Sequence, residues 1–357
     1  MSNIVALRPA PRVADPETRI AALIAGFAQH RRCEEDVFWL KENAELLNIL
    51  ECTGTRARGW IGPQALLPHA ELYAGAEARL AFFPQYYRFL LSIVLDLEDL
   101  GMPGDTAARM AESIAASGAP EAELSDLQRM EARRLLARRD LSGPDDPGLE
   151  DRLRGFCARP GTFALPNKKA AYELTHIVFY LSEYGRRDPA LEPEALTSLQ
   201  FAGHLAFLEQ NSDLLAEVCI ALRYAGAVPP ALWTGWLSRE THLFHVGQDA
   251  QAPLQDGYHD FLVCNWHLAL AGEEPFRKPL VPGGMRFERA GARIAPLREL
   301  SRALFAMKGG RCADWVVMRR RMEGALPPMV LDLLDLMARE TAHFDAFFEG
   351  FARAGRA

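Results

Sequence analysis

Four side chains that can bind a metal ion or move protons stand at matching positions in three apolar segments of the chain. Asp213 and His259 each lie thirteen residues before a glycine, and His176 and Glu217 each lie nine residues before one. Positions four apart lie one turn apart on the same face of a helix. If the three helices lie side by side in register, two imidazoles and two carboxylates meet in a small volume.

This set of groups suits zinc or non-haem iron, which bind imidazole and carboxylate ligands and leave a position open for water or substrate. We therefore predict His176, Asp213 and His259 as metal ligands, with zinc or iron as the metal. Glu217 is the predicted general base, together with Glu173, which precedes His176 by one turn.

Two other interpretations of the same residues remain open. Without a metal, the four groups could act as general acid and base, because burial and mutual charge separate their pKa values. Alternatively, the acids could form buried ion pairs with Arg88 or Arg134 and have no catalytic role, since an unpaired buried carboxylate is costly.

Further residues of the same segments are candidates to line a binding site for a small molecule. Aromatic side chains with a few polar groups are typical of ligand sites, which makes Tyr172 and Tyr180 candidate substrate-binding residues. His267, two turns after His259, would border the same space. Arg88 lies near a predicted helix start, where the helix dipole also favours an anionic group.

The elements that must position these residues are marked by six glycines spaced 41 to 47 residues apart. Each closes an apolar helical segment, as glycine does when it ends a helix in the left-handed conformation. The period fits a pair of antiparallel helices. The glycine-ended helices, being more apolar, are expected to form an inner layer, at 34–52, 83–100, 122–140, 168–184, 211–225 and 257–271.

The repeat predicts an all-α fold, an α/α toroid of about six to seven helical hairpins, with a ring favoured over an open superhelix. One short β-hairpin is expected near 285–295, where the residues alternate in character. Residues 1–16 are expected to form a disordered tail, and 17–357 a single toroid domain.

The glycine-ended hairpins at this period resemble those of the α/α toroids: lanthionine cyclases, the prenyltransferase and terpene-cyclase class, and six-hairpin glycosidases. The Gly-His-Gly turn and the two-cysteine, one-histidine zinc set of lanthionine cyclases are not found here. The segments ELTHIVFYLSEYG, NSDLLAEVCIAL and YHDFLVCNWHL look more like an uncharacterised bacterial family of helical proteins. No catalytic residue is transferred from any of these families.

The composition and charge of the chain limit the kinds of molecule that we expect it to bind. A net charge of −7 argues against nucleic acid, whose binding requires a basic surface. The sequence contains no run of about 18 apolar residues, so we expect no helix that spans a membrane. Arginines and prolines interrupt the first residues where a secretion signal would be apolar, so we expect a cytoplasmic protein.

Two functions follow as hypotheses. The first is a metal-dependent enzyme acting on a small organic or peptide substrate in a central cavity. The alternative is a non-catalytic helical-repeat protein that binds a peptide or protein on its concave surface.

Overall fold

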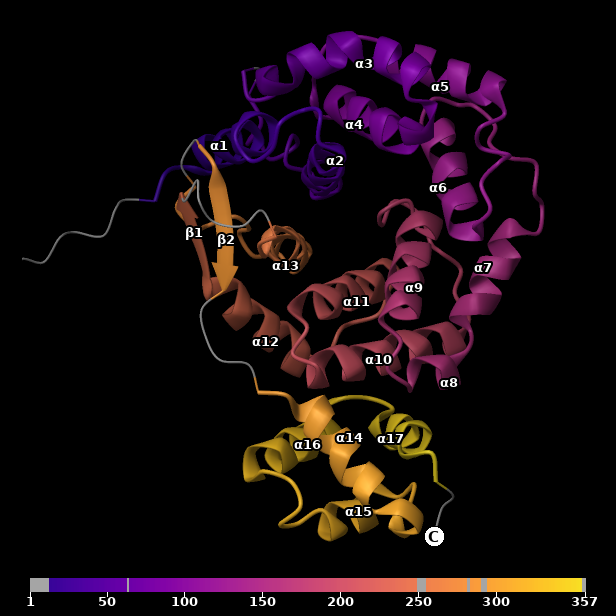
Figure 1. The fold of residues 1–357 in the computed structure, drawn as a ribbon, viewed down its shortest axis with the longest axis vertical. Coiled ribbons are helices and arrows are strands. Elements are labelled where there is room, and N and C mark those ends of the chain that lie inside the picture. Colours follow the sequence, from indigo (N-terminus) through magenta and orange to yellow (C-terminus); the bar gives the residue numbers. More distant parts are fainter. Residues whose placement is uncertain (1–12, 63, 249–254, 281–282, 290–293, 355–357) are drawn as a thin grey trace, which may run out of the picture.

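The computed structural model describes residues 13–62, 64–248, 255–280, 283–289 and 294–354, and nearly all of its regular structure is helical (Figure 1). The all-α class with a short two-stranded insertion is confirmed. Most of the predicted tail, residues 1–12, lies outside the described residues.

Twelve helices form two concentric layers (Figure 1). The inner layer consists of the glycine-ended helices α2 (Val37–Cys52), α4 (Tyr87–Leu100), α6 (Asp126–Ala137), α9 (Lys168–Leu181), α11 (Ser212–Tyr224) and α13 (Tyr258–Leu270). The outer layer consists of α1 (Pro16–Gln29), α3 (Ala70–Phe82), α5 (Thr106–Ser117), α7 (Leu149–Cys157), α10 (Pro193–Leu208) and α12 (Ala231–His242). Each inner helix contacts the next one, and α13 contacts α2, so the inner layer closes into a ring.

Burial differs between the inner helix α11 and the outer helix α5. In α11 every residue from Ser212 to Leu222 is buried, whereas in α5 the buried residues form one stripe that includes Ala107, Met110 and Ile114. The outer helix α10 is an exception, because Phe201–Leu208 are all buried. A helix apolar on all sides belongs between neighbours, and one with a single apolar stripe belongs at the surface. The short helix α8 (Pro160–Phe163) and the 3₁₀ turns η1 (Leu67–His69), η2 (Pro84–Tyr86) and η3 (Lys308–Gly310) complete the connections.

Five of the six repeat glycines have the positive φ expected of a residue that ends a helix, and Gly143 does not. There α6 ends at Ala137, and Asp140 takes the left-handed conformation with a φ of 58°. A Cβ atom on Gly143 would lie 2.6 Å from the Cα of Arg133. Close approach of two backbones, rather than a helix cap, therefore requires this glycine.

A two-stranded antiparallel ribbon lies where the ring closes. Strand β2 (Met285–Arg289) falls within the predicted hairpin, but its partner is β1 (Phe244–Gln248), not the residues that follow β2. Residues 290–293 of the expected hairpin lie outside the described residues. Phe287 of β2 packs on Phe27 of α1 and Phe261 of α13, so the ribbon covers the joint between the first and last hairpins.

The buried side chain of Arg31 connects the segments that meet at this joint. Its fully buried side chain forms ion pairs with Glu42 of α2 at 3.0 Å and with Asp256 at 2.9 Å, and donates to the carbonyl of Met285 at 2.6 Å. Burial opposes its charge, but the hydrogen bonds that it donates to Asp256 and Glu42 raise the pKa of Arg31 overall. The guanidinium thus joins segments more than 200 residues apart in sequence.

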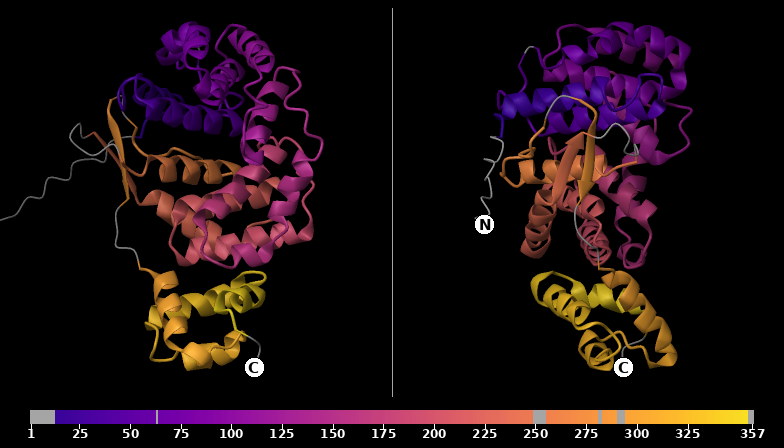
Figure 2. Two further views of the ribbon diagram at one scale, coloured as in Figure 1. Left: turned by 45° about the vertical axis from the view of Figure 1, so that its right-hand side comes forward. Right: turned by 60° about the vertical axis from the view of Figure 1, so that its left-hand side comes forward.

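The last four helices lie outside the ring (Figure 2). They are α14 (Pro296–Ala306), α15 (Trp315–Arg321), α16 (Pro328–Glu340) and α17 (Phe344–Ala352), and they contact the outer helices α10 and α12. His204 of α10 makes a hydrogen bond with Thr341 at 2.8 Å and stacks on Phe347. The ring itself is therefore built by the residues up to α13.

Candidate functional site

Residues at equivalent positions of three successive inner helices are joined directly. Tyr172 of α9 donates from Oη to Oδ2 of Asp213 in α11 at 2.7 Å. His259 of α13 contacts Oδ1 of the same carboxylate through Nδ1 at 2.9 Å. All three stand thirteen residues before their repeat glycine. The register argument therefore places them correctly in space.

Glu217 lies one turn further along α11, and its side chain is only 3% exposed. Thr175 of α9 donates to its Oε2 at 2.5 Å, and Nδ1 of His176 lies 3.9 Å from the same oxygen. Burial raises the pKa of Glu217, because the interior disfavours a charged carboxylate. All four residues of the predicted cluster thus lie in one neighbourhood.

The hydrogen bonds fix which nitrogen of each histidine carries a proton. Nδ1 of His176 lies 2.7 Å from the backbone carbonyl of Tyr172, and a carbonyl only accepts, so this nitrogen must donate. Nδ1 of His259 donates to Asp213 for the same reason. Each ring therefore directs its Nε2 away from that bond, an arrangement common for metal-bound histidines.

His259 is protonated at neutral pH, because its pKa is raised in the fold. Burial opposes its protonation, but the carboxylates of Asp213 and Glu45 raise its pKa to about 10. In the same way burial would raise the pKa of Asp213, yet the charge on His259 lowers it overall. The pair is therefore an ion pair near neutral pH.

Glu45 of α2 extends the cluster across the joint of the ring. Its Oε1 lies 3.6 Å from Nε2 of His259 and 2.8 Å from Nζ of Lys41, and its Oε2 accepts from Tyr258 at 2.8 Å. Glu45 stands nine residues before its repeat glycine, so the same counting could have included it. Tyr258 and Thr175 occupy neither counted position and were missed.

Three of these residues can hold a metal ion. Asp213, Glu217 and His259 each offer a ligand atom, and those three atoms lie within 4.8 Å of one another. This group differs from the predicted ligand set, because Glu217 takes the place of His176. His176 lies beside the group, against Glu217.

An aromatic layer follows the polar cluster along the inner helices. Tyr180, one turn after His176, is buried, and its ring centroid lies 6.2 Å from that of the imidazole. Phe179 packs against Trp266 with centroids 5.0 Å apart. Nε1 of Trp266 donates to the hydroxyl of Tyr224 at 3.1 Å. The polar groups thus lie over an apolar floor, where water is excluded on one side.

The other predicted site residues lie apart from the cluster. Glu173 is half-buried on α9, and its described partner is Lys169 of the same helix at 3.9 Å. Arg88 of α4 is held by Glu123 at 3.0 Å and by Glu131. His267 is buried, and burial lowers its pKa to about 4, so it is neutral.

The structure therefore brings Tyr172 and Tyr180 to the cluster or its floor, and pairs Arg88 and Glu173 elsewhere. The expected ion pairs of Asp213 or Glu217 with Arg88 or Arg134 are not those observed. Asp213 pairs with His259 instead, and Arg134 with Glu183.

The fold and the cluster define a double ring of helical hairpins with a polar centre of histidines and carboxylates. Residues 1–354 match the family described as Domain of unknown function (DUF6902), and the chain belongs to that family. No curated protein and no solved structure matches the chain. Among the described residues, no helix combines the length and apolar character needed to cross a bilayer.

Proposed function

We propose that the chain is a cytoplasmic metal-dependent enzyme that acts on a small organic or peptide substrate in the middle of the ring. The observation that carries this proposal is the convergence of Asp213, Glu217 and His259 within 4.8 Å. Around a zinc ion with bonds of about 2 Å, tetrahedral ligand atoms lie about 3.3 Å apart. Small side-chain movements are enough to reach that spacing.

His176 has the properties of a residue that contacts the substrate or completes the metal site. Its Nδ1 proton is held by a backbone carbonyl, and its side chain is 37% exposed. Nε2 is then the nitrogen left to bind a cation or to exchange a proton. Its neighbour Glu217 lies deeper, at 3% exposure, and would hold the cation.

Closure of the inner layer favours this proposal over the alternative of a peptide-binding repeat protein. A superhelix that binds a long partner offers a continuous concave face. Here α13 contacts α2, so the inner helices close on one another and do not continue as an open concave face. Exposure of 30% at His259 and 37% at His176 indicates that solvent reaches the polar centre.

Metal binding must compete with the ion pair between His259 and Asp213. A protonated imidazole cannot act as a ligand, so the cation has to displace the proton. We therefore expect affinity for the metal to fall as the pH is lowered. A metal-free acid–base centre would use the same residues without this competition.

Metal content tests the proposal. Protein prepared without an affinity tag, stripped with a chelator and incubated with Zn²⁺ or, without oxygen, Fe²⁺, is expected to retain one ion per chain after gel filtration. The double variant Asp213→Asn, Glu217→Gln should retain less than about a tenth of that, because two of three ligands are lost. Elemental analysis measures both.

Two matched variants control for charge and imidazole content. Glu173→Gln removes a carboxylate of α9 that pairs with Lys169, and His242→Ala removes an exposed imidazole of α12. Both should keep the wild-type metal content. The proposal fails if the wild type retains no metal, or if the double variant retains as much as the wild type.

A further inference from the structure

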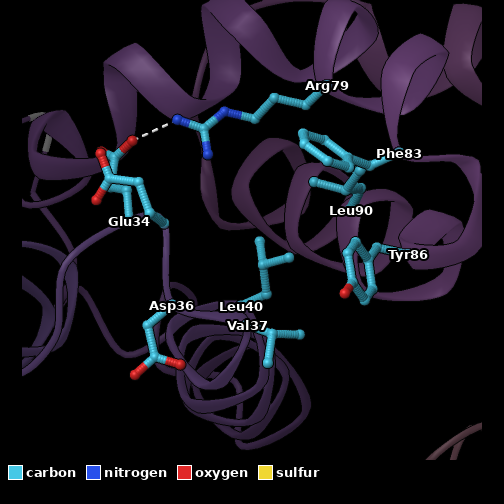
Figure 3. A pocket seen from close by; sticks show the side chains of 9 residues that line it. Glu34, Asp36, Val37, Leu40, Arg79, Phe83, Tyr86 and Leu90 are labelled. Carbon is cyan, nitrogen blue, oxygen red and sulfur yellow. Dashed lines mark hydrogen bonds and ion pairs between the residues drawn. The ribbon is translucent and has the colours of Figure 1, made fainter.

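A cavity opens where three elements of the first two hairpins meet, away from the residues of the polar cluster. It has a volume of about 430 Å³ and lies between the start of α2, the end of α3 and the start of α4 (Figure 3). We call it the rim pocket. This volume is within the range of sites that hold small organic molecules.

The wall of the rim pocket is apolar and partly aromatic. Leu40 of α2, Leu90 of α4 and the ring of Phe83 border it, and Tyr86 stands beside them (Figure 3). Phe83 is 44% exposed and Val37 is 40% exposed. Large apolar side chains exposed together around a cavity mark a binding surface rather than ordinary surface packing.

The mouth of the pocket is acidic. Three consecutive carboxylates, Glu34, Glu35 and Asp36, line it together with a single guanidinium, that of Arg79. Arg79 is bound by Glu34 (Figure 3). Asp36 is bound by Arg32 at 2.8 Å. Glu35 is exposed, and no described residue is paired with it. One negative charge is thus left over at the mouth.

We infer that the rim pocket binds an organic cation: an ammonium group carried on an apolar body. The apolar body would fill the space between Leu40, Phe83 and Leu90. The ammonium would lie at the mouth, near Glu35 and the aromatic faces. The rings of Phe83 and Tyr86 are neighbours, with centroids 6.3 Å apart. An aromatic face attracts a cation that lies within about 6 Å of its centroid.

An organic anion does not fit this arrangement. Three carboxylates would repel it, and the one lining guanidinium is already paired with Glu34. A neutral apolar molecule would gain the wall contacts alone. Charge therefore separates the proposed ligand from molecules of the same size.

Calorimetric titration with three eight-carbon probes tests this inference. The probes are octyltrimethylammonium and octanesulfonate, each below its micelle concentration, and 1-octanol below its solubility limit. We expect one octyltrimethylammonium ion per chain, bound at least tenfold more tightly than octanesulfonate. A chelator is kept in the buffer, so the result does not depend on the metal centre proposed above.

Paired variants locate the binding. Phe83→Ala should weaken octyltrimethylammonium about tenfold, whereas Phe305→Ala, which removes an 85% exposed phenylalanine of α14, should leave it unchanged. Glu35→Gln should weaken the cation and not 1-octanol, whereas Glu71→Gln on α3, exposed and outside the pocket, should change neither. Equal affinity for cation and anion, unchanged binding in Phe83→Ala, or no binding by the wild type would overturn the inference.

Discussion

Replacing Arg31 with methionine is expected to lower the free energy of unfolding by about 4 kcal/mol. The side chain is fully buried, and its partners Glu42 and Asp256 are 2% and 6% exposed. Removing one member of a buried ionic group leaves the remaining charges without compensation and without water. Urea unfolding of wild type and variant at neutral pH measures the difference.

Asp256 is the carboxylate most affected. Glu42 keeps a second guanidinium, that of Arg32 at 2.7 Å. Among the described residues, Asp256 keeps the backbone donors of Tyr258 and Phe287 alone. The double variant Arg31→Met, Asp256→Asn should therefore be more stable than Arg31→Met alone. Loss of the ion pair and loss of packing are separated in this way.

Arg109 offers a matched control. It also pairs with two carboxylates, Glu77 and Asp105, but all three side chains are well exposed. Exposed ion pairs contribute little, because water screens them in both states. Arg109→Met should change stability far less than Arg31→Met, and equal losses would show that burial is not what makes Arg31 important.

The sequence alone predicted which helices form the inner layer and which positions along those helices carry the clustered polar residues. Glycine after the apolar helices identified the inner layer, and five of the six glycines have the left-handed conformation that ends a helix. Counting back from each glycine gave the helical phase, and it placed Asp213 and His259 at matching positions, where the structure joins them. Tyr172 stands at the same position and donates to Asp213, a contact that was not predicted. Both contacts join successive repeats at the position that the count aligns.

The contact across the joint of the ring was not predicted, because the count was applied to the three successive helices α9, α11 and α13. Glu45 and His259 lie 214 residues apart, and they become neighbours only because the ring closes and α13 contacts α2. The partner of β2 was missed for a similar reason. No strand is predicted from the sequence at Phe244–Gln248, and the pairing with Met285–Arg289 makes this segment a strand.

Glu173 and Arg88 do not join the cluster, because each forms an ion pair with another residue. Glu173 has the right spacing from His176, but on the helix surface it also lies one turn from Lys169, which binds it. Arg88 is placed at the expected level, yet Glu123 and Glu131 approach it from outside its own helix. Spacing gives the position of a side chain and not its partner.

Replacing Asp213 with asparagine is expected to lower the pKa of His259 by about 2 units from its value of about 10. Asparagine keeps the hydrogen-bonding shape but removes the charge 2.9 Å from Nδ1. Glu45, at 3.6 Å from Nε2, would still favour the protonated ring. Side-chain ¹H–¹⁵N spectra of metal-free protein across pH 5 to 11 follow the titration directly.

The same variant should lose stability in a pH-dependent manner. The folded pKa of His259 lies above the ordinary value of 6.5, so folding favours the proton. This contribution is fully present below about pH 6.5 and is lost as the pH rises through about 10. The side chain is 30% exposed, and solvent screening limits the contribution to about 2 kcal/mol.

The carboxylate of the pair gives the opposite slope at lower pH. Its pKa is lowered in the fold, so its contribution is present above its ordinary value of 3.8 and is lost as the pH falls further. The difference in unfolding free energy between wild type and Asp213→Asn should therefore be greatest between about pH 5 and 6.5. It should shrink towards pH 10.

Asp332→Asn, which removes an exposed carboxylate of α16, controls for the general effect of one negative charge. It should leave both the His259 titration and the pH profile of stability unchanged. A wild-type pKa near 6.5 would mean that Asp213 does not hold the proton, and then the competition between proton and metal at His259 would be absent. A shift confined to Asp213→Asn instead makes the ion pair the state from which any metal must bind.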